Sequence, residues 1–199
     1  MPAIDLRERF STLAPFCDPK GLLALSPKQR ASLVAFRRLA EIAESPVVVA
    51  NSGKSIDCFA IKQTIVSDCS VIASLTVSAL WERRFGRKLI SNIIYPQNRH
   101  QEPVFNPCGK YMVKLHLNGI LRKVVIDDRL PVGQYGQLLC SYSANKNEFW
   151  VSLLEKAYLK VMGGYDFPGS NSVSDIFFCC CVCLHFLTLL PFRTSTCTR

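Results

Sequence analysis

A cysteine at the expected start of a helix is the residue best placed for chemistry. Cys69 follows Asp68 and precedes a long run of mostly apolar residues. Unpaired backbone N–H groups and the helix dipole at such a position favour the thiolate, which is the nucleophilic form of cysteine. Free cysteines more often serve as small buried hydrophobic residues. Cys69 is therefore a candidate nucleophile, with a core residue as the alternative.

A glutamine six residues earlier strengthens the case for a nucleophile. At this spacing the side-chain amide of Gln63 could donate to an oxyanion beside the backbone N–H of Cys69. This pair of donors would stabilise the negative charge that develops when a thiolate attacks a carbonyl group. The chemistry predicted from the two residues is acyl transfer.

Two other patterns are weaker. Gly53-Lys54-Ser55 lacks the first glycine of a phosphate-binding loop, because Val48 stands there, so a plain turn is the better interpretation. The segment 176–192 carries no charged residue, but a membrane span needs about 20 apolar residues and this run contains Pro191. Its adjacent cysteines cannot all point at one zinc ion. We predict no metal site there and interpret 176–199 as a tail outside the fold.

Hydrophobic periodicity predicts the elements that must position these residues. Helices are expected from Pro27 to Ser45 and from Ser70 to Phe85, and a third from Phe149 to Met162. The second is apolar on nearly every side, which predicts that only its C-terminal turn reaches water. Period-two alternation between 111 and 126 around Asn118-Gly119 predicts a β-hairpin, ended by Asp127-Asp128 and Pro131. The predicted class is α+β.

Composition narrows the partners and the compartment. The 199 residues are 49% hydrophobic and 20% charged, which is typical of a globular protein, and the net charge of +9 is not gathered in one block. We therefore expect no nucleic-acid partner. Charged residues occupy the first 25 positions where a signal peptide would be apolar, so we expect an intracellular, cytoplasmic protein with reduced thiols.

Four motifs in order carry a resemblance to a known family. They are I-K-Q-T-I-V-S-D-C-S at 61–70, G-K-Y-M-V-K-L-H-L-N-G at 109–119, V-V-I-D-D-R-L-P-V at 124–132 and W-V-S-L-L-E-K-A-Y-L-K-V-M-G-G-Y at 150–165. Together they cover roughly positions 56–175, and such a set is far more specific than one motif. The chain resembles the calpain cysteine proteases of the papain-like clan, and within them the PalB-like branch.

The resemblance implies an incomplete papain-like fold. Residues 1–55 would form a lead-in with one helix, 56–175 a mainly helical first catalytic subdomain with a β-hairpin, and 176–199 the tail. The family roles that it implies are Cys69 as nucleophile and Gln63 as oxyanion donor of a calcium-dependent-type cysteine endopeptidase. The family pattern has Gly and Trp where Ser67 and Ser70 stand. Its calcium-binding acidic residue, nine places before the cysteine, is replaced by Ala60.

The other half of the catalytic triad is expected elsewhere. A papain-like nucleophile has its His and Asn about 130 to 150 residues downstream, at or beyond Arg199. We expect His100, His116 and His185 to serve no catalytic role. Asn106, in an N-P-C-G sequence similar to the family's asparagine motif, is interpreted as a turn.

The expected function is thus that of a calpain fragment acting on protein substrates and inactive alone. The alternatives are a non-catalytic protein-interaction module and a membrane-anchored fragment held by 176–192. Relatives of the PalB-like branch carry MIT modules that recruit ESCRT-III proteins. Nothing at 1–55 matches such a module, so that partner is not expected.

Overall fold

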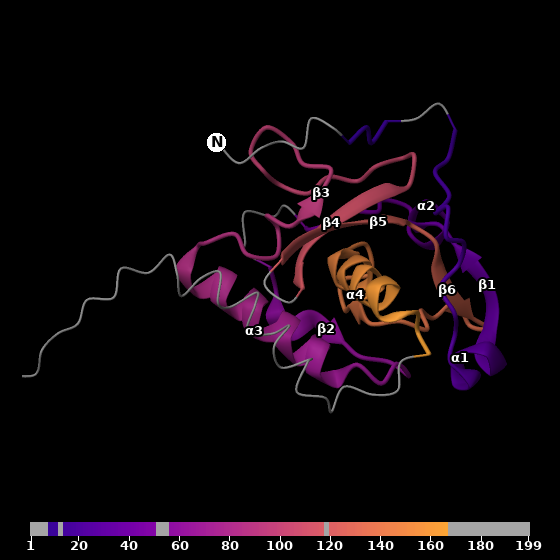
Figure 1. The fold of residues 1–199 in the computed structure, drawn as a ribbon. Helices are drawn as coiled ribbons and strands as arrows, with labels where there is room; N and C mark the ends of the chain where they lie inside the picture. The colour runs from indigo at the N-terminus through magenta and orange to yellow at the C-terminus, as the bar shows by residue number, and fades with distance from the viewer. Residues whose placement is uncertain (1–7, 12–13, 51–55, 118–119, 167–199) are drawn as a thin grey trace, which may run out of the picture.

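A computed structural model describes residues 8–11, 14–50, 56–117 and 120–166 of the chain. Short helices and strands alternate with two longer helices and one long hairpin, so the predicted α+β class is confirmed (Figure 1). The elements are α1 (Pro27–Ser32), β1 (Leu33–Arg37), α2 (Leu39–Ile42), η1 (Cys58–Ala60), β2 (Ile61–Lys62), α3 (Cys69–Phe85), β3 (Ile94–Tyr95), β4 (Lys110–Leu117), β5 (Ile120–Asp127), β6 (Leu130–Gly133), β7 (Tyr142–Ser143) and α4 (Trp150–Met162).

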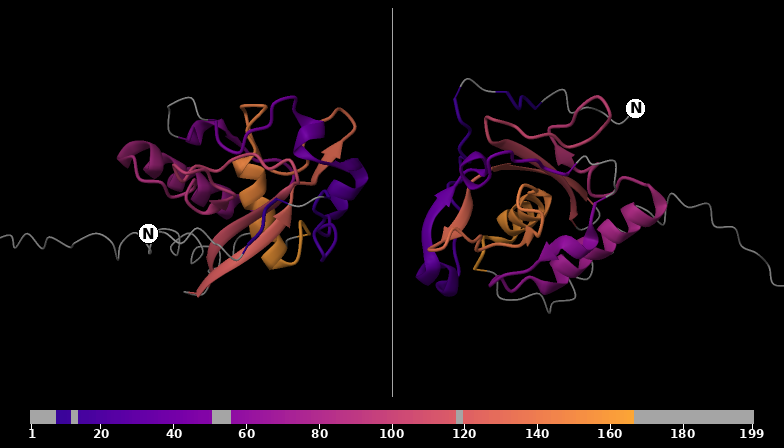
Figure 2. Two further views of the ribbon diagram at one scale, coloured as in Figure 1. Left: turned by 90° about the horizontal axis from the view of Figure 1, so that it is seen from above. Right: turned by 180° about the vertical axis from the view of Figure 1, so that it is seen from behind.

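Helix α4 forms the centre of the molecule. Figure 1 and the right view of Figure 2 look along this helix and show α3 on one side, the β4–β5 hairpin arching over it and β6 on another side. Every residue from Trp150 to Leu159 is buried, including Ser152, Glu155 and Lys156. The helix ends as predicted, because Gly163 adopts the left-handed conformation at φ 103°. The polar residues of α4 must therefore find partners inside the protein.

The predicted hairpin is confirmed. Strands β4 and β5 pair antiparallel from Lys110 opposite Asp127 to Leu117 opposite Ile120, and β3 pairs with the other edge of β4. The register leaves two residues for the connection, as the Asn-Gly sequence predicts. The turn residues themselves lie outside the described part of the chain. Pro131 does not simply end this region, because it lies inside β6, opposite Phe36 of β1.

The single helix predicted from Pro27 to Ser45 is wrong. The capping box is present, since Ser26 and Gln29 exchange hydrogen bonds, but the helix ends after Ser32. Residues Leu33–Arg37 then form β1, which pairs antiparallel with β6. The apolar spacing fitted a helix, but the backbone groups of this segment are satisfied by a distant strand instead.

Helix α3 begins at Cys69 and ends at Phe85, with Gly86 as the C-cap, within a residue of the predicted bounds. Its burial differs from the prediction. Val71, Ile72, Leu75 and Ala79 face the core, whereas Val77 is 53% and Leu80 45% exposed. The helix packs along one side only, so an apolar strip reaches solvent. The Gly53-Lys54-Ser55 turn and the segment 176–199 lie outside the described residues.

Candidate active site

Cys69 is the first residue of the 17-residue helix α3, and its thiol is exposed. The alternative in which Cys69 is a buried core residue is therefore wrong. The preceding residue, Asp68, is the N-cap of the helix, and its carbonyl oxygen accepts from the N–H groups of Val71 (2.9 Å) and Ile72 (3.1 Å). The N-terminal turn thus presents a solvent-accessible thiol where the helix dipole favours negative charge.

Gln63 lies beside this turn, on the short segment between β2 and α3. Its Nε2 donates to the carbonyl oxygen of Val66 at 3.0 Å and to Oδ1 of Asp68 at 3.1 Å. The amide is therefore tied to the residue adjacent to the thiol. The structure brings Gln63 and Cys69 onto one end of α3, while their catalytic roles stay predictions.

Asp68 connects the site to the centre of the protein. Its side chain does not cap α3 but is buried, close enough to the Glu155 carboxyl group on α4 for each acid to affect the pKa of the other. Glu155 is also buried and accepts from the backbone N–H of Ser141 through both carboxyl oxygens, at 3.0 and 2.9 Å. Burial raises the pKa of both acids, and that of Glu155 lies well above its usual range.

Sequence reasoning missed this carboxyl pair. Glu155 lies four residues after Val151 and three before Tyr158, on the apolar face of the predicted helix. A charge on such a face is rare unless it has a buried partner. The position of Glu155 on the apolar face could therefore have indicated a buried acid. It could not have indicated Asp68 as the partner, because Asp68 is distant in sequence.

A second buried polar cluster anchors the hairpin to α4. Nζ of Lys156 donates to Oδ1 of Asp127 at 2.5 Å, and Nε of Arg129 donates to Oδ2 at 2.8 Å. The backbone N–H of Asp18 adds a third donor to Asp127 at 3.2 Å. Burial acts to raise the pKa of Asp127, but these donors together hold it below its usual value. Asp127 is thus a buried carboxylate with a full set of partners.

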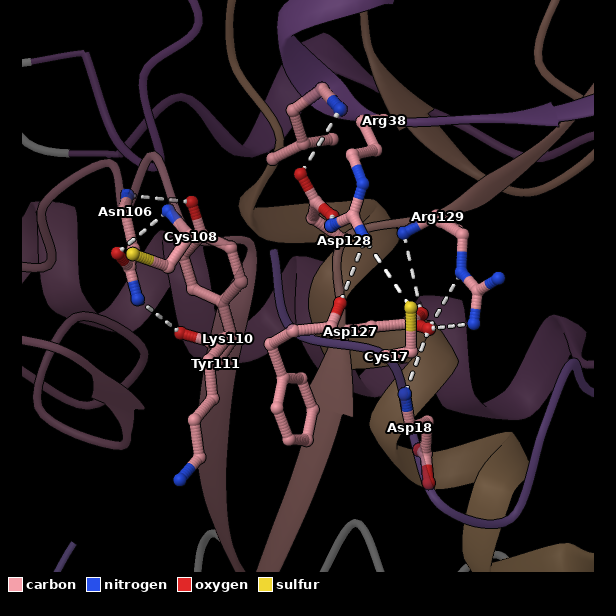
Figure 3. A network of polar contacts seen from close by, with 12 residues as sticks. Cys17, Asp18, Arg38, Asn106, Cys108, Lys110, Tyr111, Asp127, Asp128 and Arg129 are labelled. Atoms are coloured by element: carbon pink, nitrogen blue, oxygen red, sulfur yellow. Dashed lines mark hydrogen bonds and ion pairs between the residues drawn. The ribbon is translucent and has the colours of Figure 1, made fainter. Parts of the chain in front are cut away.

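The adjacent carboxyl group anchors the N-terminal region. Nη1 of Arg38 contacts Oδ1 of Asp128 at 2.6 Å, and Nη2 donates to the carbonyl oxygen of Phe16 at 2.8 Å (Figure 3). Burial raises the pKa of Asp128 despite this ion pair. Residues assigned to the lead-in therefore contact the hairpin. The proposed boundary at 55/56 stays a prediction.

The segment around Asn106 forms the predicted turn. Oδ1 of Asn106 accepts from the N–H of Cys108 at 3.1 Å, and Nδ2 donates to the carbonyl oxygen of Lys110 at 2.9 Å. Gly109 closes the turn at φ 72°, and the hydroxyl of Tyr111 accepts from the N–H of Asn106 (Figure 3). The Asn106 side chain therefore organises the entry to β4.

The histidines lie where the sequence placed them. His100 is exposed in the loop before the hairpin, and its carbonyl oxygen accepts from Nζ of Lys88. His116 lies in β4 opposite Leu121. His185 lies outside the described residues. Their lack of a catalytic role stays a prediction.

Comparison with known proteins identifies the family. A family model described as "Calpain family cysteine protease" matches residues 16–182. The chain belongs to the calpain family of cysteine proteases. It is 60% identical over 174 residues to "Calpain-7" of Mus musculus and 61% identical over 173 residues to "Calpain-7" of Homo sapiens, covering 87% of this chain and 21% of each relative.

More distant relatives point the same way. "Calpain-like protease palB/cpr-8" of Neurospora crassa is 40% identical over 162 residues, which cover 76% of this chain and 17% of the relative. The resemblance to the PalB-like branch of the calpain family is thereby confirmed. The chain spans about a fifth of the length of the Calpain-7 relatives that it matches.

The calcium position of the family pattern does not offer a carboxylate in this calpain chain. Ala60 lies in η1, and its carbonyl oxygen accepts from the N–H of Ala144 at 2.6 Å. A methyl side chain supplies no oxygen ligand of the kind that calcium requires.

In residues 8–11, 14–50, 56–117 and 120–166, no group of three or more His, Cys, Asp or Glu side chains is arranged to hold a metal ion. Over the same residues, none of the helices has the length and apolar character needed to cross a bilayer.

Proposed function

We propose that this calpain-family chain carries the nucleophile and the oxyanion donor of a cysteine endopeptidase site. The observation that carries the proposal is the exposed thiol of Cys69 on the first turn of α3, with Gln63 held beside that turn. Exposure gives a substrate access to sulfur, and the first turn of a helix leaves backbone N–H groups that can donate to an oxyanion formed there.

The reaction begins with attack of the Cys69 sulfur on a peptide carbonyl carbon. A C–S bond forms and the carbonyl π electrons move to oxygen, which the amide of Gln63 and a backbone N–H of the α3 turn stabilise. Collapse of this intermediate breaks the C–N bond, and an imidazolium group protonates the leaving amine. Water then hydrolyses the thioester.

Gln63 must exchange a partner for this step. Its Nε2 has two hydrogens, and the structure directs them at Val66 and Asp68. A bound oxyanion would replace one of these acceptors. Because Asp68 is fixed by its contact with Glu155, we propose that the Gln63–Val66 hydrogen bond is the one given up.

We further propose that the 199-residue chain by itself is labelled by suitable electrophiles but turns over no peptide. The histidine that acts as acid and base and the asparagine that orients it belong to a second subdomain of the papain-like site. Without a base, a nucleophile loses most of its rate enhancement.

Labelling with an epoxysuccinyl inhibitor tests the proposal. The modified residue is mapped by mass spectrometry, and the rate at Cys69 is compared with that at Cys17, a second exposed thiol in the same chain. Cys69→Ala is the negative control, and iodoacetamide serves as a reagent without peptide-like recognition. We expect the epoxysuccinyl inhibitor to modify Cys69 faster than Cys17, and iodoacetamide to show no such preference. Equal rates at Cys69 and Cys17 with both reagents would show that no activated site is formed.

A non-catalytic interaction module is the second candidate, and one observation favours it. The exposed strip that includes Val77 and Leu80 on α3 leaves apolar surface open to a partner. Sedimentation experiments show whether the chain self-associates. If it does, if Val77→Ser and Leu80→Ser abolish that association, and if labelling is unselective, this candidate replaces the protease site.

A further inference from the structure

Two buried carboxyl groups meet beneath the first turn of α3. Asp68 and Glu155 each have a relative exposure of 0% and come from segments far apart in the chain. Oδ1 of Asp68 accepts from Gln63, whereas Oδ2 is buried and has no hydrogen-bond partner among the described residues. Both oxygens of Glu155 accept from Ser141. The remaining contact of Asp68 is with the Glu155 carboxyl group.

Two carboxylates cannot hydrogen-bond to each other unless one of them holds a proton. Two negative charges at this distance in a buried site would also repel strongly. A protonated carboxyl group can donate its O–H to the other and satisfies the otherwise unpartnered oxygen. Complete burial, the repulsion of two like charges and the unpartnered oxygen of Asp68 therefore favour one proton held by the pair.

Among the described residues, the groups around the pair that act on its pKa values offer no cation in place of that proton. The nearby thiol of Cys140 and hydroxyl of Tyr165 are completely buried, and burial raises the pKa of each, so both are neutral. Lys156 follows Glu155 in sequence, but its ammonium donates to Asp127 and to the carbonyl oxygen of Arg129. Its charge neutralises the other buried cluster.

We propose that Asp68 and Glu155 share one proton, donated by Glu155 to Asp68, and that this hydrogen bond positions Gln63 and the first turn of α3. Glu155 is thus a positioning residue that acts on Cys69 through Asp68. The raised pKa values of both acids agree with this arrangement. The positioning role rests on the function proposed for Cys69 and Gln63, whereas the shared proton does not.

The sign of the resulting pH dependence follows from the direction of the shift. An acid with a raised pKa in the folded state holds a proton that the unfolded chain has already released. Its stabilisation is complete below the unfolded pKa and is lost as the pH rises through the folded value. Loss of this proton leaves two charges together, so Asp68 should move away and release Gln63.

Glu155→Gln is the informative variant. A glutamine amide has nearly the same shape and can donate an N–H to Asp68 at every pH, so it replaces the shared proton permanently. Glu148→Gln is the matched control, because Glu148 is also a buried glutamate but accepts from the N–H of Ala50 and the hydroxyl of Ser143. Neither substitution touches the proposed nucleophile.

Infrared spectroscopy of the full chain at neutral pH tests the proton directly. We expect a C=O stretching band of a neutral carboxylic acid in the wild-type chain and in Glu148→Gln, and its absence in Glu155→Gln. In the wild-type chain this band should disappear over the same alkaline interval in which thermal stability falls. A wild-type chain without the band, or with a band unrelated to the stability change, would overturn the shared proton. The test of the wild-type band against wild-type stability does not depend on the folding of either variant.

The ratio of Cys69 labelling rates tests the positioning role. The rate in Glu155→Gln is divided by the wild-type rate at each pH, which cancels the ionisation of the thiol itself. We expect a ratio near one at neutral pH that rises by up to about tenfold per pH unit once the wild-type pair ionises. The Glu148→Gln ratio should stay constant. A constant ratio for Glu155→Gln would refute the positioning role even if the infrared band is present.

The two proposals fail in distinguishable ways. If Cys69 is not selectively labelled at any pH, the proposed protease site is wrong. The infrared band and its link to alkaline stability still decide whether Asp68 and Glu155 share a proton.

Discussion

Replacing Lys156 by methionine should be among the most destabilising single changes in this chain. The side chains of Lys156 and Asp127 are only 4% and 1% exposed, and the ammonium donates to both Asp127 and the carbonyl oxygen of Arg129. Methionine fills a similar volume but leaves a buried carboxylate without its closest cation. Breaking a buried ion pair from one side costs about 3–5 kcal/mol.

The remaining partners of Asp127 set the expected value within that range. Arg129 and the N–H of Asp18 still contact the carboxylate, so we expect a loss of about 3 kcal/mol. Domains of this kind have a total free energy of unfolding of about 5–15 kcal/mol. The substitution would thus remove a large fraction of the stability of the fold.

Urea unfolding of the full chain measures this loss, with Lys88→Met as the matched control. Lys88 and Glu102 lie 3.7 Å apart with side chains 39% and 35% exposed, so their pair contributes at most about 1 kcal/mol. Equal losses for the two lysine variants would refute the reasoning. A second check is the double variant Lys156→Met, Asp127→Asn, which removes the buried charge and should recover part of the loss.

The pH dependence of the same variant has a definite sign. The pKa of Asp127 is lowered in the folded chain, so its stabilisation is present above the unfolded pKa and is lost as the pH falls through the folded value. Without Lys156, burial is less fully opposed and the pKa of Asp127 should rise. The stability difference between wild type and Lys156→Met should therefore shrink on acidification. A difference that grows towards low pH would contradict this account.

Two further substitutions test local backbone features by thermal or urea unfolding. Gly109→Ala should cost more than Gly21→Ala, because both glycines have positive φ but only at Gly109 would a Cβ atom overlap neighbours, the Asp128 carboxylate among them. The shared left-handed conformation costs about 1–2 kcal/mol, so equal losses would show that the Asp128 region adapts freely. Ser26→Ala removes the capping box of α1 and should cost about 1 kcal/mol, whereas Ser26→Asp should retain most of the stability. If the stability of Ser26→Ala equals that of the wild type, the pairing of β1 with β6 is sufficient to stabilise this segment without the capping box.

Features fixed by a few neighbouring residues were predictable from the sequence. Gly86 and Gly163 end α3 and α4 because glycine adopts the left-handed conformation with little strain. The hairpin register agrees with an Asn-Gly turn, and the Ser26 capping box forms as predicted. The family was also accessible, since its motifs are local strings in a fixed order.

Features that depend on distant partners were not predictable in the same way. Leu33–Arg37 carries an apolar spacing compatible with a helix, yet the segment is a strand because β6 offers its backbone a partner. The strip with Val77 and Leu80 is exposed because the neighbouring elements cover only one side of α3. Periodicity reports which residues are apolar, but not which surface the rest of the chain covers.

The sequence by itself determined the catalytic candidates, their place at the start of α3 and the calpain family. Only the tertiary structure decided how exposed these candidates are and which buried residues contact them. The tertiary structure shows that Cys69 is exposed rather than part of the core, that Gln63 is hydrogen-bonded to Asp68, and that Asp68 and Glu155 are neighbours. The physical reason is that helix ends and turns are governed by torsion angles within a few residues. The partner of a buried charge depends instead on which distant segment folds against it, because burial makes a partner or a proton obligatory without specifying its source.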